Sequence, residues 1–239
     1  MTNIRLNQQQ YETFGNGGET YLVAMPKLIA AGMQPLGVAD IMRKHLEHYH
    51  SRDSDQIHAN VWNSNYFDTG DAIISNDGNV KIVCNASPLF SVTPKSKLRN
   101  GALIITPELY QSMDGVELTK AQMEKAGIYN LLPQDRVVAH PVWQALAGGD
   151  QSLLNDYTTM VFDALRVETA MGIYVSNKRG YFLRPWLFDG YGDGHNSIAN
   201  GRRHLDYADA WLVGVLRSAN GAEGGASTAH SGLESVVQK

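Results

Sequence analysis

Cysteine is almost absent from this chain. Cys84 is the single cysteine in 239 residues, so no disulfide can form within the chain. A zinc site built from several thiolates is excluded for the same reason. Because Cys84 ends the apolar run 80–84, we expect it to be a small buried hydrophobe.

Long apolar runs are also lacking, and none approaches the roughly 20 residues that a membrane-spanning helix needs. The first residues show neither the basic start nor the apolar centre of a signal peptide. We therefore expect a cytoplasmic protein that has no membrane partner.

Charge is scarce as well: only 18% of the residues are charged, and the net charge is −4. Such a balance provides no global basic field for nucleic acid, so no nucleic-acid partner is evident. Weak like-charge repulsion between copies makes self-association an expectation.

Glycine and polar residues predict where the folded part begins and ends. Residues 1–19 are polar and glycine-punctuated, which indicates a flexible arm. Residues 218–239 contain few apolar groups and predict a disordered tail. Between them, residues 20–217 mix strand and helix patterns without regular alternation. This mixture predicts a single α+β domain with a mostly antiparallel sheet, in which two β-hairpins are packed by amphipathic helices.

Two hairpins are expected from turn residues. Asp77-Gly78 is a strong type I′ turn signal between the apolar runs 72–76 and 79–83. The runs 173–175 and 181–186 are rich in aromatic and β-branched residues and predict the second hairpin. Alternation over 56–62 indicates a further strand.

Helices are expected where apolar residues recur every three or four positions. This spacing predicts an amphipathic helix over 36–51 and a long core-packing helix after Gly148-Gly149. Thr119 and Gln122 form a capping-box pattern, which predicts a short helix over 120–126. Thr106 and Pro107 predict a brief helix through residue 110.

The stretch 186–211 gathers acid, base and guanidinium groups among four glycines. A loop this rich in glycine can aim neighbouring side chains at one point. The simpler alternative is a polar surface loop, with Arg202 and Asp206 as a solvated pair if 198–207 is helical. The groups we consider are His195, His204 and Asp193 as catalytic residues, and Arg202, Arg203 and Asp189 as ligand-binding residues.

Histidines in the expected helix 36–51 have the residue types of a transition-metal site. His45, His48 and His50 are the candidate metal ligands, because imidazoles three residues apart share one helix face. The alternative places His45 in the core and His50 at the helix end, where a cation interacts favourably with the helix dipole.

The segment 66–83 contains two sequence patterns that are known from enzyme families. Asp68-Thr69-Gly70 is the triplet of the aspartic proteases, whose chemistry needs two such carboxylates, and one copy is present. The whole segment resembles the hairpin of the adenylate-forming acyl-CoA synthetases, where the aspartate holds a ribose. No phosphate loop accompanies it here. We interpret the likeness as shared hairpin geometry, with Asp71 as a candidate ligand-binding residue.

Two functions from different classes remain open. The first is a non-catalytic binding or assembly protein, favoured by low charge and by the absence of catalytic motifs. The second is a hydrolase or transferase acting on a phosphate-bearing ligand, through the arginines, histidines and aspartates of 186–211. An anionic small molecule is the expected partner in the second case. The sequence identifies no cofactor.

Overall fold

The computed structural model describes residues 3–6, 9–15, 18–51, 62–176, 180–192 and 194–216. Its strands form one sheet. They are β1 Asn3–Leu6, β2 Gln9–Phe14, β3 Gln34–Pro35, β4 Tyr66–Asn76, β5 Asn79–Val83, β6 Leu98–Arg99, β7 Ala102–Ile104, β8 Val116–Leu118, β9 Ile173–Tyr174, β10 Phe182–Asp189, β11 Ala199–Asn200 and β12 Trp211–Val215.

The sheet is mixed rather than purely antiparallel. Its main path runs β1-β2-β12-β4-β10-β11-β9, and the pairs β12–β4 and β11–β9 are parallel. The shorter strands extend it sideways: β5 pairs with β4 and β8, while β7 pairs with β10 and β6. The α+β class is therefore confirmed, and the expected antiparallel arrangement is confirmed only in part.

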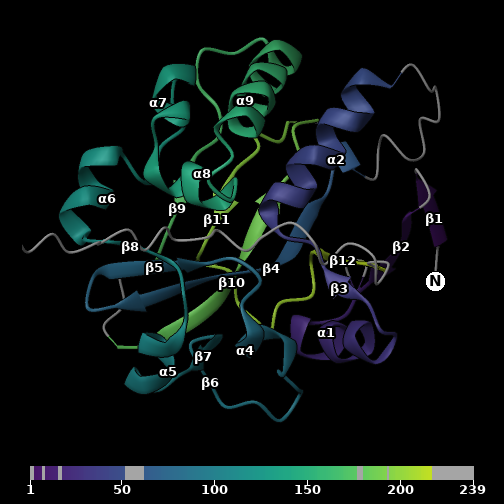
Figure 1. Cartoon of the computed structure of the whole chain (residues 1–239), viewed down its shortest axis with the longest axis vertical. Helices are drawn as coiled ribbons and strands as arrows, with labels where there is room; N and C mark the ends of the chain where they lie inside the picture. Colours follow the sequence, from purple (N-terminus) through teal and green to yellow (C-terminus); the bar gives the residue numbers. More distant parts are fainter. Residues whose placement is uncertain are drawn as a thin grey trace, which may run out of the picture.

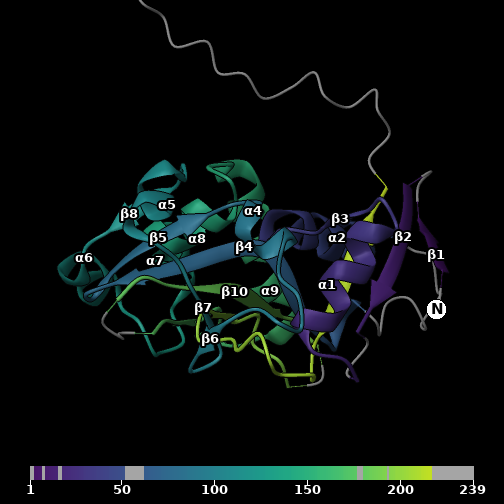
Figure 2. The ribbon, with the colours of Figure 1, turned by 90° about the horizontal axis from the view of Figure 1, so that it is seen from below.

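Helices cover both faces of the sheet (Figure 1). On one face lie α2, α7, α8 and α9, and on the other lie α1, α4 and α5. The helices are α1 Tyr21–Ala30, α2 Val38–His50, α4 Ser87–Phe90, α5 Pro107–Ser112, α6 Lys120–Ala126, α7 Gln134–Val138, α8 Pro141–Leu146 and α9 Gln151–Leu165. In the turned view of Figure 2, β1 and β2 lie at the opposite end of the molecule from α6.

The central strand β4 is buried on both sides. Ile73 points into the core under α2, α8 and α9, while its neighbours Ala72 and Ile74 belong to the opposite core. Alternate side chains of a strand point to opposite faces, so a strand between two helical layers needs apolar residues at successive positions.

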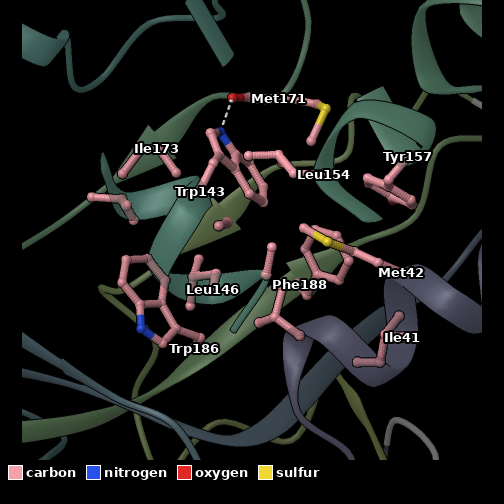
Figure 3. Packing of buried hydrophobic residues seen from close by; sticks show 14 of the residues in the cluster. Ile41, Met42, Trp143, Leu146, Leu154, Tyr157, Met171, Ile173, Trp186 and Phe188 are labelled. Carbon is pink, nitrogen blue, oxygen red and sulfur yellow. Dashed lines mark hydrogen bonds between the residues drawn. The ribbon is translucent and has the colours of Figure 1, made fainter. Parts of the chain in front are cut away.

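The larger core is built around β10 (Figure 3). Trp186 and Phe188 from β10 lie beside Leu146 of α8. The indole nitrogen of Trp143 donates a hydrogen bond of 2.9 Å to the carbonyl of Met171. Burying the aromatic rings in this core removes a large apolar area from water, and the hydrogen bond satisfies the indole's polar end.

A register shift interrupts the pairing of β10 with β4 between Pro185 and Leu187. Proline has no backbone N–H to donate to the ladder. At the shift, the hydroxyl of Thr69 donates a hydrogen bond of 2.9 Å to the carbonyl of Trp186. The threonine of the Asp-Thr-Gly triplet thus satisfies a carbonyl at an irregularity of the sheet.

The expected helices form with close to the expected bounds. Thr119 and Gln122 make the capping box of α6, which begins at Lys120 and ends at Ala126 as predicted. Asp150 caps α9 by accepting a hydrogen bond of 3.0 Å from the N–H of Leu153. The predictions for α2 and α5 are confirmed as well, within about two residues at each end.

The first hairpin is also confirmed. Strands β4 and β5 pair antiparallel around Asp77 and Gly78, whose φ angles are 49° and 92°. Positive φ at both central positions is what a type I′ turn requires.

The second hairpin prediction is wrong. Strand β9 pairs in parallel with β11, whereas β10 pairs with β4, β7 and β11. Strand β10 lies in the middle of the sheet, where the 11-residue β4 occupies one edge and the short strands β7 and β11 occupy the other. Strand β9 pairs with β11 instead.

The structure corrects two smaller expectations. Residues 3–6 and 9–14 form strands rather than a flexible arm, because β2 pairs with the distant strand β12 and buries Tyr11. Cys84 is exposed, since it lies just beyond the end of β5. The predicted tail and, apart from Trp62, the predicted strand 56–62 fall outside the described residues.

Candidate functional site

The stretch 186–211 connects two neighbours of β4, namely β10 and β12. Arg184 of β10 holds its backbone from the inside. This guanidinium donates hydrogen bonds to the carbonyls of Arg202, at 3.2 Å, and Arg203, at 2.9 Å, and to that of Asn100. A buried charge persists only when such partners surround it, so the loop is fixed where it crosses Arg184.

Arg203 is buried in an ion pair with Asp68 of β4. Its Nε lies 2.7 Å from Oδ1 of Asp68, and its Nη2 lies 3.0 Å from Oδ2. The third nitrogen, Nη1, contacts Asp209. Burial raises the pKa of Asp68 to about 6, and the charge of Arg203 acts in the opposite direction. All three guanidinium nitrogens are therefore used within the fold.

Arg202 points elsewhere. Its guanidinium carbon lies 4.5 Å from the ring centre of Tyr129, and its Nε donates a hydrogen bond of 3.1 Å to the carbonyl of Val175. Residues 198–207 contain β11 and turns rather than a helix, so the anticipated pair between Arg202 and Asp206 is absent. The two arginines do not converge on one point, and their role as anion ligands stays a prediction.

Asp189 and His195 do come together, at the carboxyl end of β10. Oδ1 of Asp189 contacts Nδ1 of His195, and the N–H groups of Gly190 and Asn196 also hydrogen-bond to this carboxylate. Burial raises the pKa of Asp189 to about 6, opposed by the neighbouring imidazole. The contact joins two of the candidate site residues, whose roles stay predictions, and Asp193 lies outside the described residues.

Near this pair lie two contacts between rings, one on each side of the Arg203–Asp209 ion pair, and we call this group of side chains the aromatic strip. The ring of Tyr66 lies 4.8 Å from that of His195, edge to face. The charge of Asp209, like that of Asp189, contributes to raising the pKa of Tyr66, with burial as the largest cause. The rings of His204 and Tyr207 stack at 4.4 Å. The members of the aromatic strip are His195, Tyr66, Asp209, Tyr207 and His204.

The two tyrosines of the strip are open to solvent, whereas the side chain of His195 is only 14% exposed. Tyr66 and Tyr207 are 43% and 50% exposed, large values for rings of this size. Beneath them, Arg203 lies 5.7 Å from the Tyr207 ring centre while its guanidinium stays buried. The buried ion pair of Asp68 and Arg203 thus holds the loop in place, while the rings of Tyr66 and Tyr207 face the solvent.

Among the described residues, the histidines of α2 are not gathered into a group that could hold a metal ion, and their role as ligands stays a prediction. His45 is fully buried, and burial lowers its pKa to about 3. His48 stacks on Trp62 at 6.1 Å, and His50 lies beside Tyr49 at the exposed helix end. No three His, Cys, Asp or Glu residues in the described part of the chain lie close enough to hold a metal ion. The alternative, a core position for His45 and a helix-end position for His50, is what the structure shows.

His45 instead belongs to a buried row of hydrogen bonds. Its Nδ1 lies 2.9 Å from the hydroxyl of Tyr157, which lies 2.7 Å from the hydroxyl of Ser197. Ser197 follows the aromatic strip residue His195 by two positions and has a φ of 52°. The row therefore connects α2 and α9 to the loop that carries the strip.

Asp71 is buried, and its carboxylate accepts hydrogen bonds from backbone N–H groups instead of facing the solvent. One oxygen accepts a hydrogen bond of 2.7 Å from the N–H of Val38, and the other accepts one of 2.9 Å from Asn85. Burial raises its pKa to about 6, and these N–H groups oppose the shift. A β-carbon at Gly37 would lie 2.9 Å from both carboxylate oxygens, so Asp71 fits closely against the first turn of α2.

Sequence reasoning missed Arg184, Asp68 and the two exposed tyrosines of the strip. One signal was present for Arg184: a charged residue within an otherwise apolar strand needs buried partners. No comparable signal marks Tyr66, because only folding brings it beside His195. Tyr207 lies three positions after His204, but the fold decides that its ring is exposed.

No protein-family model and no curated protein sequence matches this chain. Its fold is similar to a solved structure from work on the accommodation of massive sequence variation in Nanoarchaeota by the C-type lectin fold. The alignment has a TM-score of 0.68 and 15% sequence identity, over 89% of this chain and 100% of the other. This likeness shows that the chain has a C-type lectin fold. Among the described residues, no helix is long and apolar enough to cross a membrane.

Proposed function

We propose that this chain is a non-catalytic binding protein whose ligand contacts the aromatic strip. The supporting observation is the contrast between the strip and its base: the exposed rings belong to Tyr66 at the start of β4 and to Tyr207 in the loop, whereas the Asp68–Arg203 pair that joins β4 to the loop is buried. Binding residues are commonly carried on loops that a rigid scaffold positions. Rings that are already in place lose little freedom when a ligand arrives.

The fold agrees with this proposal. The C-type lectin fold is a binding fold, and the similar structure is one in which it accommodates massive sequence variation. The exposed tyrosines Tyr66 and Tyr207 meet that condition here, since exchanging them leaves the Asp68–Arg203 pair intact. The strip offers flat apolar faces, imidazoles and the carboxylate of Asp209. A ligand with an apolar face and hydrogen-bond donors would complement it.

The second function, a hydrolase or transferase acting on a phosphate-bearing ligand, retains one supporting observation, the contact of Asp189 with His195. An imidazole oriented by a carboxylate can act as a general base. Against it, Arg203 is occupied by Asp68 and Asp209, and Arg202 lies over Tyr129. We therefore place binding first. Self-association and a cytoplasmic location stay predictions, and sedimentation velocity tests the former.

A thermal-shift screen against neutral sugars, sugar phosphates, nucleotides and divalent metals tests the proposal, because a ligand that binds the folded state raises the melting temperature. For the best ligand, we expect Tyr207→Ala to weaken binding by at least about 1 kcal/mol, the scale of an aromatic contact residue. Tyr49→Ala is the control, since Tyr49 is similarly exposed (44%) and lies on α2.

Three results would contradict the proposal. Equal losses in the two tyrosine variants would show that the strip is not the binding surface. A complete failure of the screen would mean that the strip binds none of these ligand classes. Turnover of a phosphate ester that His195→Ala abolishes would favour the enzymatic alternative.

A further inference from the structure

Helices α2 and α9 lie side by side (Figure 1), and side chains from both helices line a groove. Its volume is about 570 Å³, within the range of roughly 300–1,000 Å³ for small-molecule sites. The side chains that the argument uses are Leu46, Tyr49 and His50 from α2, and Asp156, Met160 and Asp163 from α9. None of them belongs to the aromatic strip.

The carboxylates on the α9 side have no neutralising partner. Asp156 and Asp163 are exposed, and no ion pair joins either one to another residue of the described chain. They are seven positions apart, which places them on one face with a separation of roughly 10 Å along the helix.

The charges on the α2 side are already balanced. Arg43 lies 3.6 Å from Asp40 and 3.5 Å from Asp150, and Glu47 pairs with Lys44. The groove therefore has an excess of negative charge, located at its α9 wall. A cationic ligand would complement it.

Between the two carboxylates the lining is mostly apolar, with the exposed hydroxyl residue Thr159 as its polar member. Met160 is buried beneath the groove, Leu46 is half-buried, and the ring of Tyr49 is exposed beside His50. A methionine adapts its shape to an alkyl chain, and a tyrosine face attracts an ammonium group. The order along the groove is thus acid, mostly apolar surface, acid.

From this order we infer that the groove binds an aliphatic diamine or linear polyamine. Its ammonium groups, roughly 10 Å apart, would contact Asp156 and Asp163, and its alkyl chain would cover Met160 and Leu46. This site is separate from the aromatic strip and does not depend on the function proposed for it.

Isothermal titration calorimetry of the full chain with diaminooctane, at low ionic strength, tests the inference. The extended diamine spans about the distance between the carboxylates. We expect diaminopropane to bind about tenfold more weakly, because it reaches only one carboxylate, and octylamine to bind similarly weakly, because it has one charge.

The double variant Asp156→Asn, Asp163→Asn should weaken diaminooctane binding about tenfold and leave the melting temperature unchanged, because both side chains are exposed. The control is the double variant Asp114→Asn, Asp135→Asn, which removes two exposed carboxylates elsewhere and should keep the affinity within about twofold.

Equal binding of diaminooctane by the two double variants would overturn the inference, since only diffuse charge would then attract the diamine. Equal affinities for diaminooctane and octylamine, or no heat of binding to the parent chain at millimolar diamine, would overturn it too. A loss of diamine binding that is matched by a large fall in the melting temperature would also count against it, because the carboxylates would then act in folding.

Discussion

Two buried polar clusters hold the loop that carries the aromatic strip, and they differ in charge. The ionic cluster consists of Asp68 and Arg203, with Arg184 on the adjacent carbonyls. The neutral cluster consists of His45, Tyr157 and Ser197. Both are almost fully buried, so a polar atom that loses its partner there has no water to replace it.

The difference lies in what each cluster tolerates. An arginine keeps its charge at every ordinary pH, so the ionic cluster needs its carboxylate partner. The neutral cluster needs an uncharged histidine, since burial disfavours a proton on the imidazole of His45. Removing a charge should therefore damage the first cluster, and adding a proton should damage the second.

The largest expected effect comes from breaking the ionic cluster. Arg203→Met leaves the carboxylate of Asp68 buried without its partner and should lower the free energy of unfolding by about 3–5 kcal/mol. Urea denaturation at pH 7 measures it. The control Arg202→Met removes an exposed guanidinium and should change stability by less than about 1 kcal/mol.

Restoring neutrality should recover part of this loss. Adding Asp68→Leu to Arg203→Met removes the unpaired carboxylate, so the double variant should be more stable than Arg203→Met alone. If Arg203→Met proves as stable as the parent, the ionic cluster does not hold the loop.

Acidification should act on the neutral cluster. Folded His45 has a pKa of about 3, against 6.5 for an ordinary histidine, so between these values only the unfolded chain binds the proton. Its contribution to stability is complete above pH 6.5 and is lost as the pH falls toward 3. Between pH 7 and pH 5 the loss should be about 2 kcal/mol.

His45→Gln isolates this contribution. Glutamine keeps a polar group near Tyr157 but does not titrate, while every other titrating group is shared with the parent. The difference between the parent's stabilities at pH 7 and pH 5 should therefore exceed that of the variant by about 2 kcal/mol. Identical pH dependence in both chains would show that His45 is not the sensitive group.

The smallest effect is expected at the loop end of the neutral cluster. Ser197→Ala removes one hydrogen bond to the hydroxyl of Tyr157 and should lower stability by about 0.5–1.5 kcal/mol. The control Ser152→Ala, at an exposed position of α9, should stay within about 0.5 kcal/mol. A loss above 3 kcal/mol at Ser197 would mean that the two clusters are strongly coupled.

Several elements could be predicted because the residues that specify each of them lie close together in the sequence. The turn at Asp77-Gly78, the capping box of Thr119 and Gln122, and the apolar face of α9 each depend on residues a few positions apart. Local backbone preference and helix periodicity decide such features. The contact of Asp189 with His195 belongs to this group, since six positions and a glycine-rich turn separate the two residues.

The partners of the candidate site residues lie far away in the sequence. Arg203 pairs with a carboxylate 135 positions away. Asp71 accepts a hydrogen bond from the first turn of α2, 33 positions away. Their roles in binding a ligand stay predictions. Neither partner can be identified from neighbouring residues, because the sheet brings β4 beside the loop only after its strands have paired.

By itself, therefore, the sequence determined the α+β class, the first hairpin, the main helices and a polar loop near the end of the chain. The tertiary structure alone decided the partners of β10, the place of β2 in the sheet and the division of the loop into buried ion pairs and exposed rings. The physical reason is that strand pairing and charge burial join residues that are far apart in the chain. The energy of such contacts depends on what surrounds them, and no local pattern records it.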